Sequence, residues 1–190
     1  MSYFVPVGLS NKHVHICAED LVTLFGEGHE LTPSKPLTQP GQYAAEEKVD
    51  VVGPRGTLKG VRILGPIRPE TQVELSVTDA RSLGISLPVR ESGKLEGTPG
   101  LKLVGPAGEV EMVKGAIVAH RHVHLSPEQA KEAGVVDKQI VSVRAGGERS
   151  LVFNNVMIRT GEGHQAEAHF DTDEGNAAGL TNCEMGEILV

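Results

Sequence analysis

The sequence predicts a mainly β protein made of two closed β-barrel-like halves that arose by internal duplication and are capped by short α-helices. Two observations support this prediction. Many short runs of β-branched residues are bounded by glycine or proline, and one segment of the chain occurs twice. Many short strands at close spacing favour barrels or sandwiches over a parallel sheet with crossover helices.

The predicted strands are short and rich in valine and isoleucine. They cover 49–52, 61–64, 73–77, 140–143 and 156–158. Aromatic residues make up only 3% of the chain, so the core must consist mainly of aliphatic side chains.

The repeated segment is a strand that leads into a short helix. Its first copy is GLSNKHVHI at 8–16 and its second copy is AIVAHRHVHL at 116–125. After the second copy, Ser126, Pro127 and Gln129 suit the cap and first turn of a helix, and Gly134 suits its end. Each copy therefore predicts a strand and a helix of two or three turns, followed by more strands.

Further matches extend the duplication. The turn-like sequence VGPRG at 52–56 resembles VGPAG at 104–108, and QVELS at 72–76 aligns with QAEAH at 165–169. We therefore predict a first β-barrel half at 1–90 with His13 and His15, a bridging segment at 91–114, and a second half at 115–190 with His122 and His124.

Composition excludes several classes of function. The formal net charge of -7 argues against a general nucleic-acid binder, and the absence of tryptophan argues against recognition of bases by stacking. No apolar run is long enough to span a membrane, and the first residues do not resemble a signal peptide. Cys17 and Cys183 are expected to be reduced thiols in a cytoplasmic protein.

The strongest chemical signal is the pair His13-Val14-His15 and its copy His122-Val123-His124. Residues two apart on a strand point to the same face, so both imidazoles of a pair can approach one ion. A single pair is more often two surface or structural histidines. Two copies at equivalent places in a duplicated chain favour metal binding, and both pairs could line one cleft.

Each predicted metal site needs more ligands. Glu74 lies on a predicted strand, and His169 follows Glu167 by two residues, so the latter two share a face. The alternatives are a solvated carboxylate for Glu74 and a helix-cap or surface histidine for His169. His120 and His164 are expected to be outer-shell or structural residues.

Imidazole ligands favour zinc over magnesium or calcium, and three protein ligands leave one coordination position open for catalysis. Arg62 and Arg68 precede Glu74, and an arginine beside a metal can bind phosphate in bidentate fashion. Lys35 lies in an insertion relative to the second copy, and such segments are often binding lids. The alternative for all three is a solvated surface residue.

Several long motifs together resemble one known family. They are NKHVH at 11–15, GPIRPETQVE at 65–74, HRHVHLSP at 120–127 and DTDEGNA at 171–177. With these motifs the chain resembles, over nearly its whole length, the PduL-type phosphate propanoyltransferase (phosphotransacylase) family of propanediol utilisation.

The resemblance implies a fold of two closed β-barrels and a reversible reaction of acyl-CoA, either acetyl- or propanoyl-CoA, with inorganic phosphate to give acyl phosphate and coenzyme A. It also implies two zinc ions per chain, in the cleft between the barrels, and an arginine that binds phosphate. The implied residues are His13, His15 and Glu74 for the first zinc, His122, His124 and His169 for the second, Arg68 for phosphate, and Ser10, Lys35, Arg62, Leu64 and Asn176 for coenzyme A. Because no activated serine or cysteine nucleophile is evident, direct attack by phosphate in a ternary complex is expected.

Members of this family that enter bacterial microcompartments carry an N-terminal amphipathic extension. This chain begins almost at its first strand, so we expect a cytoplasmic protein, with microcompartment association and homo-oligomer formation left open. Competing interpretations are a zinc-dependent hydrolase such as an acyl-CoA thioesterase, which would release free acid without phosphate, and a non-catalytic zinc-stabilised binding module.

Overall fold

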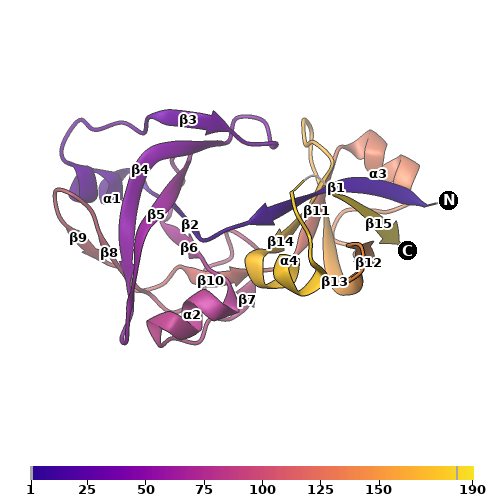
Figure 1. Ribbon diagram of the computed structural model, residues 1–190. Helices are drawn as coiled ribbons and strands as arrows, with labels where there is room; N and C mark the ends of the chain where they lie inside the picture. Colours follow the sequence, from indigo (N-terminus) through magenta and orange to yellow (C-terminus); the bar gives the residue numbers. More distant parts are fainter. Residues whose placement is uncertain (1, 183) are drawn as a thin grey trace. The chain divides into compact units, whose positions relative to one another are not determined.

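The computed structural model of the protein describes residues 2–182 and 184–190, so Cys183 lies outside the described residues. Over the described part the chain forms fifteen strands and four short helices, in the order shown in Figure 1. The predicted mainly β fold with short helices is therefore confirmed. No helix of the described residues is long and apolar enough to cross a membrane.

The strands fall in two groups along the chain. The first ten are β1 (Tyr3–Ser10), β2 (His13–His15), β3 (Pro33–Pro36), β4 (Tyr43–Val52), β5 (Thr57–Gly65), β6 (Gln72–Glu74), β7 (Val89–Arg90), β8 (Lys102–Val104), β9 (Glu109–Glu111) and β10 (Ala116–Ala119). The last five are β11 (His122–Leu125), β12 (Ile140–Ala145), β13 (Leu151–Thr160), β14 (Glu167–Asp171) and β15 (Met185–Leu189). The helices are α1 (Ala18–Phe25), α2 (Val77–Leu83), α3 (Pro127–Ala133) and α4 (Thr172–Ala178).

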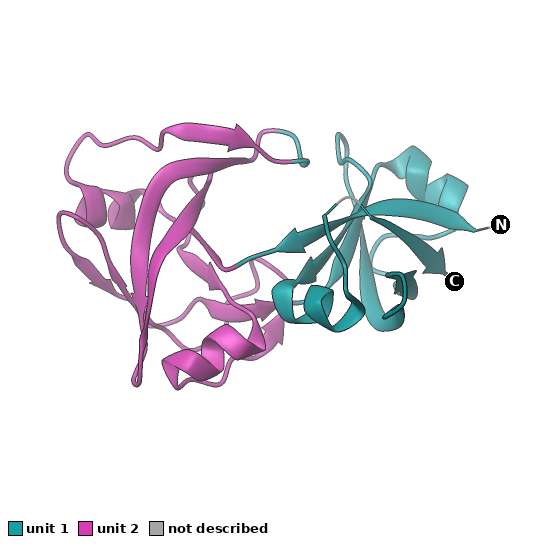
Figure 2. Cartoon of the chain, in the orientation of Figure 1, with its two compact units in different colours: residues 1–11, 38–40, 120–190 teal, residues 12–37, 41–119 magenta. Residues whose placement is uncertain are grey.

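The chain divides into two compact units, drawn in different colours in Figure 2. Unit 1 contains residues 1–11, 38–40 and 120–190, and unit 2 contains residues 12–37 and 41–119. These boundaries differ from the predicted halves, because β1 pairs with β14 and β15 and so belongs with the C-terminal part of the chain. The predicted bridging segment contributes the hairpin β8–β9, which pairs with β4 inside unit 2.

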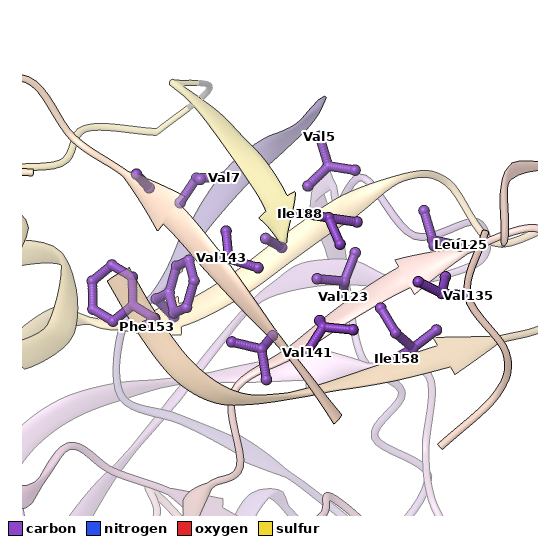
Figure 3. Packing of buried hydrophobic residues seen from close by; sticks show 14 of the residues in the cluster. Val5, Val7, Val123, Leu125, Val135, Val141, Val143, Phe153, Ile158 and Ile188 are labelled. Carbon is purple, nitrogen blue, oxygen red and sulfur yellow. The ribbon is translucent and has the colours of Figure 1, made fainter. Parts of the chain in front are cut away.

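Unit 1 is a closed barrel with the strand order β1-β14-β11-β13-β12-β15, and the pairing of β15 with β1 closes it. Its core is aliphatic, as the composition predicts, except for two phenylalanines whose ring centroids lie 4.3 Å apart. Figure 3 shows Val123 and Ile158 among these core side chains. Because Val123 is 0% exposed, the histidines on either side of it must point to the opposite face of β11.

Unit 2 is a curled sheet that stays open. Its strand order is β7-β10-β6-β2-β5-β4-β8-β9, with β3 paired to β4. Barrel closure is thus complete in one unit, whereas the other forms a half-barrel. Val14 of β2 is 0% exposed in the core of unit 2, as Val123 is in unit 1.

The helix predicted after the second histidine pair is confirmed. Ser126 accepts a hydrogen bond from the backbone of Gln129, Gln129 completes the capping box, and Gly134 ends α3 in the left-handed conformation.

Helices α2 and α4 were not predicted. The predicted strand 73–77 was wrong at its end, because β6 stops at Glu74 and Ser76 caps α2 by accepting from the Asp79 N–H. Asp171 and Glu174 form a capping box at the start of α4 in the same way. In each case the sequence signal was a polar cap residue with an acidic residue three positions later.

The strand register corrects the predicted alignment of the repeats. His13 pairs with Glu74 across β2 and β6, and His122 pairs with His169 across β11 and β14. Glu74 is therefore equivalent to His169 and not to Glu167, so the alignment of 72–76 with 165–169 was wrong by two residues. The equivalent segments are 72–76 and 167–171, and both end in a helix cap, Ser76 or Asp171.

The two VGPxG turns both lie in unit 2, so they do not relate the two halves. The Arg55 N–H donates to the carbonyl of Leu83 at the end of α2, and the Ala107 N–H donates to the carbonyl of Leu24 near the end of α1. A Cβ atom on Gly53 would lie 2.6 Å from that Leu83 oxygen, which explains why the turn begins with glycine. This similarity therefore relates two hairpin turns within one unit, between β4 and β5 and between β8 and β9, each hydrogen bonded to a residue at or near the end of a helix.

Candidate metal centres

Unit 2 brings His13, His15 and Glu74 together, as the sequence predicted. His13 Nε2 lies 3.4 Å from Glu74 Oε2, and His15 Nε2 lies 3.7 Å from Glu74 Oε1. All three residues are buried, and their ligand atoms lie within 4.8 Å of one another. The geometry follows from the local structure: β2 presents both histidines on one face, and β6 places Glu74 opposite His13.

The electrostatics of this centre favour the metal-binding forms of its side chains. Burial, together with the charge of His13, lowers the pKa of His15 to about 3, so this imidazole is neutral near pH 7. Burial alone would raise the pKa of the Glu74 carboxyl. The charge and hydrogen bond of His13, with smaller contributions from His15 and Ser92, outweigh burial and hold that pKa well below its ordinary value. A neutral imidazole and an ionised carboxylate are the forms that bind metals.

Unit 1 brings His122, His124 and His169 together in the same way, with ligand atoms again within 4.8 Å of one another. His122 Nε2 lies 3.1 Å from His124 Nε2, and the His169 ring centroid lies 4.9 Å from those of both other rings. Burial, followed by the charges of His122 and His169, lowers the pKa of His124 to about 2.

The other ring nitrogens of these histidines have partners of their own. His122 Nδ1 donates to the carbonyl of His120 over 2.8 Å, which leaves Nε2 with its lone pair. His169 Nε2 lies 2.6 Å from Glu167 Oε2 and donates to it, which leaves Nδ1 as the nitrogen with a lone pair. His124 Nδ1 lies 3.4 Å from His164 Nδ1.

Both centres fit a tetrahedral transition metal. Bonds of about 2.0–2.1 Å place the ligand atoms of such an ion roughly 3.3 Å apart. The distances of 3.1 Å between His122 Nε2 and His124 Nε2 and of 3.4 Å between His13 Nε2 and Glu74 Oε2 are close to this value. Three protein donors in each centre, all nitrogen in unit 1 and two nitrogens with one oxygen in unit 2, leave one coordination position for a substrate.

Basic residues accompany the centre of unit 2. The charge of Arg68 contributes to the low pKa of His15, and the Arg68 backbone N–H donates to the carbonyl of Ile16. Arg62 lies on β5 opposite His13, and its guanidinium donates to the carbonyl of Ala45.

The remaining predicted coenzyme A residues are divided between the units. Lys35 is exposed on β3, and Leu64 is half-buried on β5. In unit 1, Ser10 ends β1 opposite Asp171, and Asn176 is exposed on α4.

Of the other histidines, His120 and His164 contact metal-centre residues, whereas His29 pairs with a carboxylate. His29 Nε2 lies 3.0 Å from Glu47 Oε1, and the His29 ring stacks on Phe25. His120 touches the unit 1 centre through its carbonyl and His164 through its ring.

The sequence analysis placed Glu167 on the same face as His169 but assigned no supporting role to any residue beside the third ligand of each centre. In unit 2, Gln72 and Ser92 both hydrogen bond to Glu74, and in unit 1 Glu167 hydrogen bonds to His169. Gln72 and Glu167 could have been found, because each precedes the third ligand by two residues on the same strand face. Ser92 lies in a loop and had no such signal.

The protein is therefore mainly β, and each of its two units contains three residues that could together bind a metal ion. A family model described as phosphate propanoyltransferase matches residues 6–181. Similar proteins include a phosphate propanoyltransferase of Thermotoga maritima, 56% identical over 186 residues that cover 97% of this chain and 89% of the relative. Another, from Citrobacter freundii, is 50% identical, covering 98% of this chain and 89% of the relative, and one from Salmonella typhimurium is 52% identical, covering 94% and 85%.

The chain belongs to the phosphate propanoyltransferase family. The resemblance found in the sequence motifs is thereby confirmed, and so is the prediction that the chain is an enzyme of the phosphate acyltransferase class.

Proposed function

We propose that this chain is a zinc-dependent phosphate acyltransferase that reversibly converts acetyl- or propanoyl-CoA and inorganic phosphate into acyl phosphate and coenzyme A. The observation that carries the zinc proposal is the pair of His-rich centres, one in each unit, with ligand atoms at metal-binding distances. The relatives' shared name, phosphate propanoyltransferase, supports phosphate and a propanoyl group as reactants.

His13, His15 and Glu74 would hold one zinc ion, and His122, His124 and His169 would hold the other. Imidazole-dominated ligand sets favour zinc over the oxygen-seeking ions magnesium and calcium. Bound zinc would supply positive charge that polarises a thioester carbonyl and stabilises a thiolate.

Arg68 would bind the phosphate and hold one of its oxygens against the acyl carbon. A guanidinium matches two phosphate oxygens at once, and the arginine backbone is anchored to Ile16 next to β2. Ser10, Lys35, Arg62, Leu64 and Asn176 would contact coenzyme A.

In the proposed reaction both substrates are bound before any bond breaks. A phosphate oxygen attacks the thioester carbon, the carbon–sulfur bond breaks, and coenzyme A leaves with the bonding electron pair as a thiolate. Because the two reactants are oriented in one complex, no covalent acyl-enzyme is needed.

We also propose a cytoplasmic location, with microcompartment association as the alternative. Cell fractionation can distinguish the two.

The deciding experiment follows thiol release from several acyl-CoAs with and without phosphate, before and after chelation. We expect phosphate-dependent formation of acyl phosphate, loss of turnover on chelation, and recovery with zinc. Equal thiol release without phosphate, yielding free acid, would identify a thioesterase instead. Full turnover by the metal-free protein would refute the zinc proposal.

A further inference from the structure

A partly buried polar network in unit 2 joins the third metal ligand to the arginine proposed to bind phosphate. At its centre is Ser92, in the segment between β7 and β8. Its hydroxyl lies 3.0 Å from Glu74 Oε1, 2.8 Å from Gln72 Nε2 and 3.1 Å from Arg68 Nη1. A hydroxyl has one donor and two acceptor positions, so donation to Glu74 and acceptance from the other two groups use its full capacity.

The orientation of the Gln72 side-chain amide is fixed by its own hydrogen bonds. The side chain is almost completely buried, with 1% of the residue exposed. Gln72 Oε1 accepts from the Gly93 N–H over 2.7 Å, so the amide nitrogen must face Glu74 and Ser92. That nitrogen donates to Glu74 Oε1 over 2.5 Å and to Ser92 over 2.8 Å. The same glutamine thus holds both the Glu74 carboxylate and the loop that carries Ser92.

The network treats the two oxygens of Glu74 differently. Oε1 accepts from both Gln72 and Ser92, whereas Oε2 is the oxygen closest to His13 Nε2, at 3.4 Å. Two hydrogen bonds on one oxygen fix the rotation of the carboxylate about its terminal bond. The other oxygen, Oε2, is thereby directed toward His13 Nε2.

We propose that Ser92 is a positioning residue that sets the orientation of Glu74 and of Arg68 together. This inference rests on the proposed function, in which Glu74 holds zinc and Arg68 holds phosphate. Because one hydroxyl contacts both groups, its loss should weaken metal binding and phosphate binding at the same time. Hydrogen bonds to a metal ligand typically change metal affinity by about 10- to 100-fold.

The test compares Ser92→Thr with Ser92→Val, because these side chains have nearly the same shape and differ by the hydroxyl. Ser150→Ala is the control, since Ser150 is an exposed serine of unit 1. Zinc affinity of the unit 2 centre is measured by chelator competition in a His122→Ala background, which disables the other centre. The KM for phosphate, the KM for acyl-CoA and kcat are measured in the otherwise unchanged chain.

We expect Ser92→Val to lower zinc affinity by about 10- to 100-fold and to raise the KM for phosphate about tenfold, with the KM for acyl-CoA nearly unchanged. Ser92→Thr should remain within about threefold of the wild type in each quantity. Equal values for the valine and threonine variants, or a change in only one of the two binding constants, would overturn the positioning role. Thermal unfolding of the two variants checks that both are folded.

The failure of this inference can be told apart from failure of the proposed function. A wild-type protein that binds no zinc and needs none would refute the proposed function. A wild-type protein that binds zinc, with a valine variant that binds zinc and phosphate equally well, would refute the role of Ser92 alone.

Discussion

The two candidate metal centres are built on the same strand pairing but differ in their third ligand. In unit 2 the carboxylate of Glu74 lies opposite His13, and in unit 1 the imidazole of His169 lies opposite His122. The residue two positions before the third ligand differs in a complementary way. The amide of Gln72 donates to the carboxylate, whereas the carboxylate of Glu167 accepts from the imidazole.

The same strand pairing therefore supports two centres whose ligand sets differ in charge. A carboxylate ligand would neutralise one positive charge of a bound divalent ion, whereas three neutral imidazoles would neutralise none. With zinc bound, the negative charge nearest the unit 2 ion would be the ligand Glu74 itself, whereas in unit 1 it would be Glu167, which lies behind the ligand His169. The supporting residue differs with the ligand, so that in each centre a donor is paired with an acceptor.

The largest expected effect comes from removing one histidine from either centre. His13→Ala and His122→Ala should each lower the zinc content from two ions to one per chain and reduce kcat by roughly a thousandfold, since metal charge is lost from the reaction. Elemental analysis and steady-state assays measure both quantities. His29→Ala is the control, because His29 pairs with Glu47 and lies outside both ligand sets. Loss of both ions in either single variant would show that the centres do not bind independently.

Replacement of Arg68 tests whether phosphate binding can be separated from metal binding. Arg68→Ala should reduce kcat/KM for phosphate by more than about a hundredfold, because a charged donor to the reacting anion is lost. Both zinc ions should remain bound. Arg90→Ala, at an exposed position of the same unit, should behave like the wild type. Normal turnover by Arg68→Ala would remove this residue from the chemistry.

Glu167→Gln tests the complementary support in unit 1. A glutamine can still reach the imidazole, but it lacks the charge that makes the carboxylate a strong acceptor. We therefore expect zinc affinity of the unit 1 centre to fall by about 10- to 100-fold while the unit 2 centre is unchanged. Chelator competition in a His13→Ala background measures it, with Glu162→Gln as the exposed control. Unchanged affinity would mean that the pairing with His169 has no role in metal binding.

The smallest expected effect concerns the helix that follows the third ligand in unit 1. Burial raises the pKa of Glu174 in the capping box of α4 from 4.5 to about 6. The folded state then binds more protons than the unfolded state between these values, so the free energy of unfolding falls as pH rises through this window. The loss attributable to Glu174 is about 2 kcal/mol, at 1.36 kcal/mol per unit of pKa.

Urea unfolding of the wild type and of Glu174→Gln from pH 4 to 7 measures this effect. The difference in unfolding free energy between the two proteins should shift in favour of the glutamine variant as pH rises. Glu148→Gln, at an exposed loop position, should show no such shift. A constant difference across the range would contradict the raised pKa of Glu174.

Features that depend on local periodicity could be predicted correctly from the sequence. Two histidines separated by one valine must share a face of a strand, and Ser126, Pro127 and Gln129 must favour the start of a helix. These features placed both histidine pairs and the first turn of α3 correctly, because each depends on residues only a few positions apart.

The residues that complete each centre are distant in sequence and could be identified only from the pairing of the strands. The antiparallel register of β2 with β6 and of β11 with β14 makes Glu74 and His169 equivalent. The predicted alignment of 72–76 with 165–169 had missed this equivalence. Ser92 reaches Glu74 from a loop 18 residues away. Likewise, β1 joins the barrel of unit 1 through pairing with β14 and β15. Such pairings are selected by burial and hydrogen bonding across the whole unit, and no short stretch of sequence specifies them.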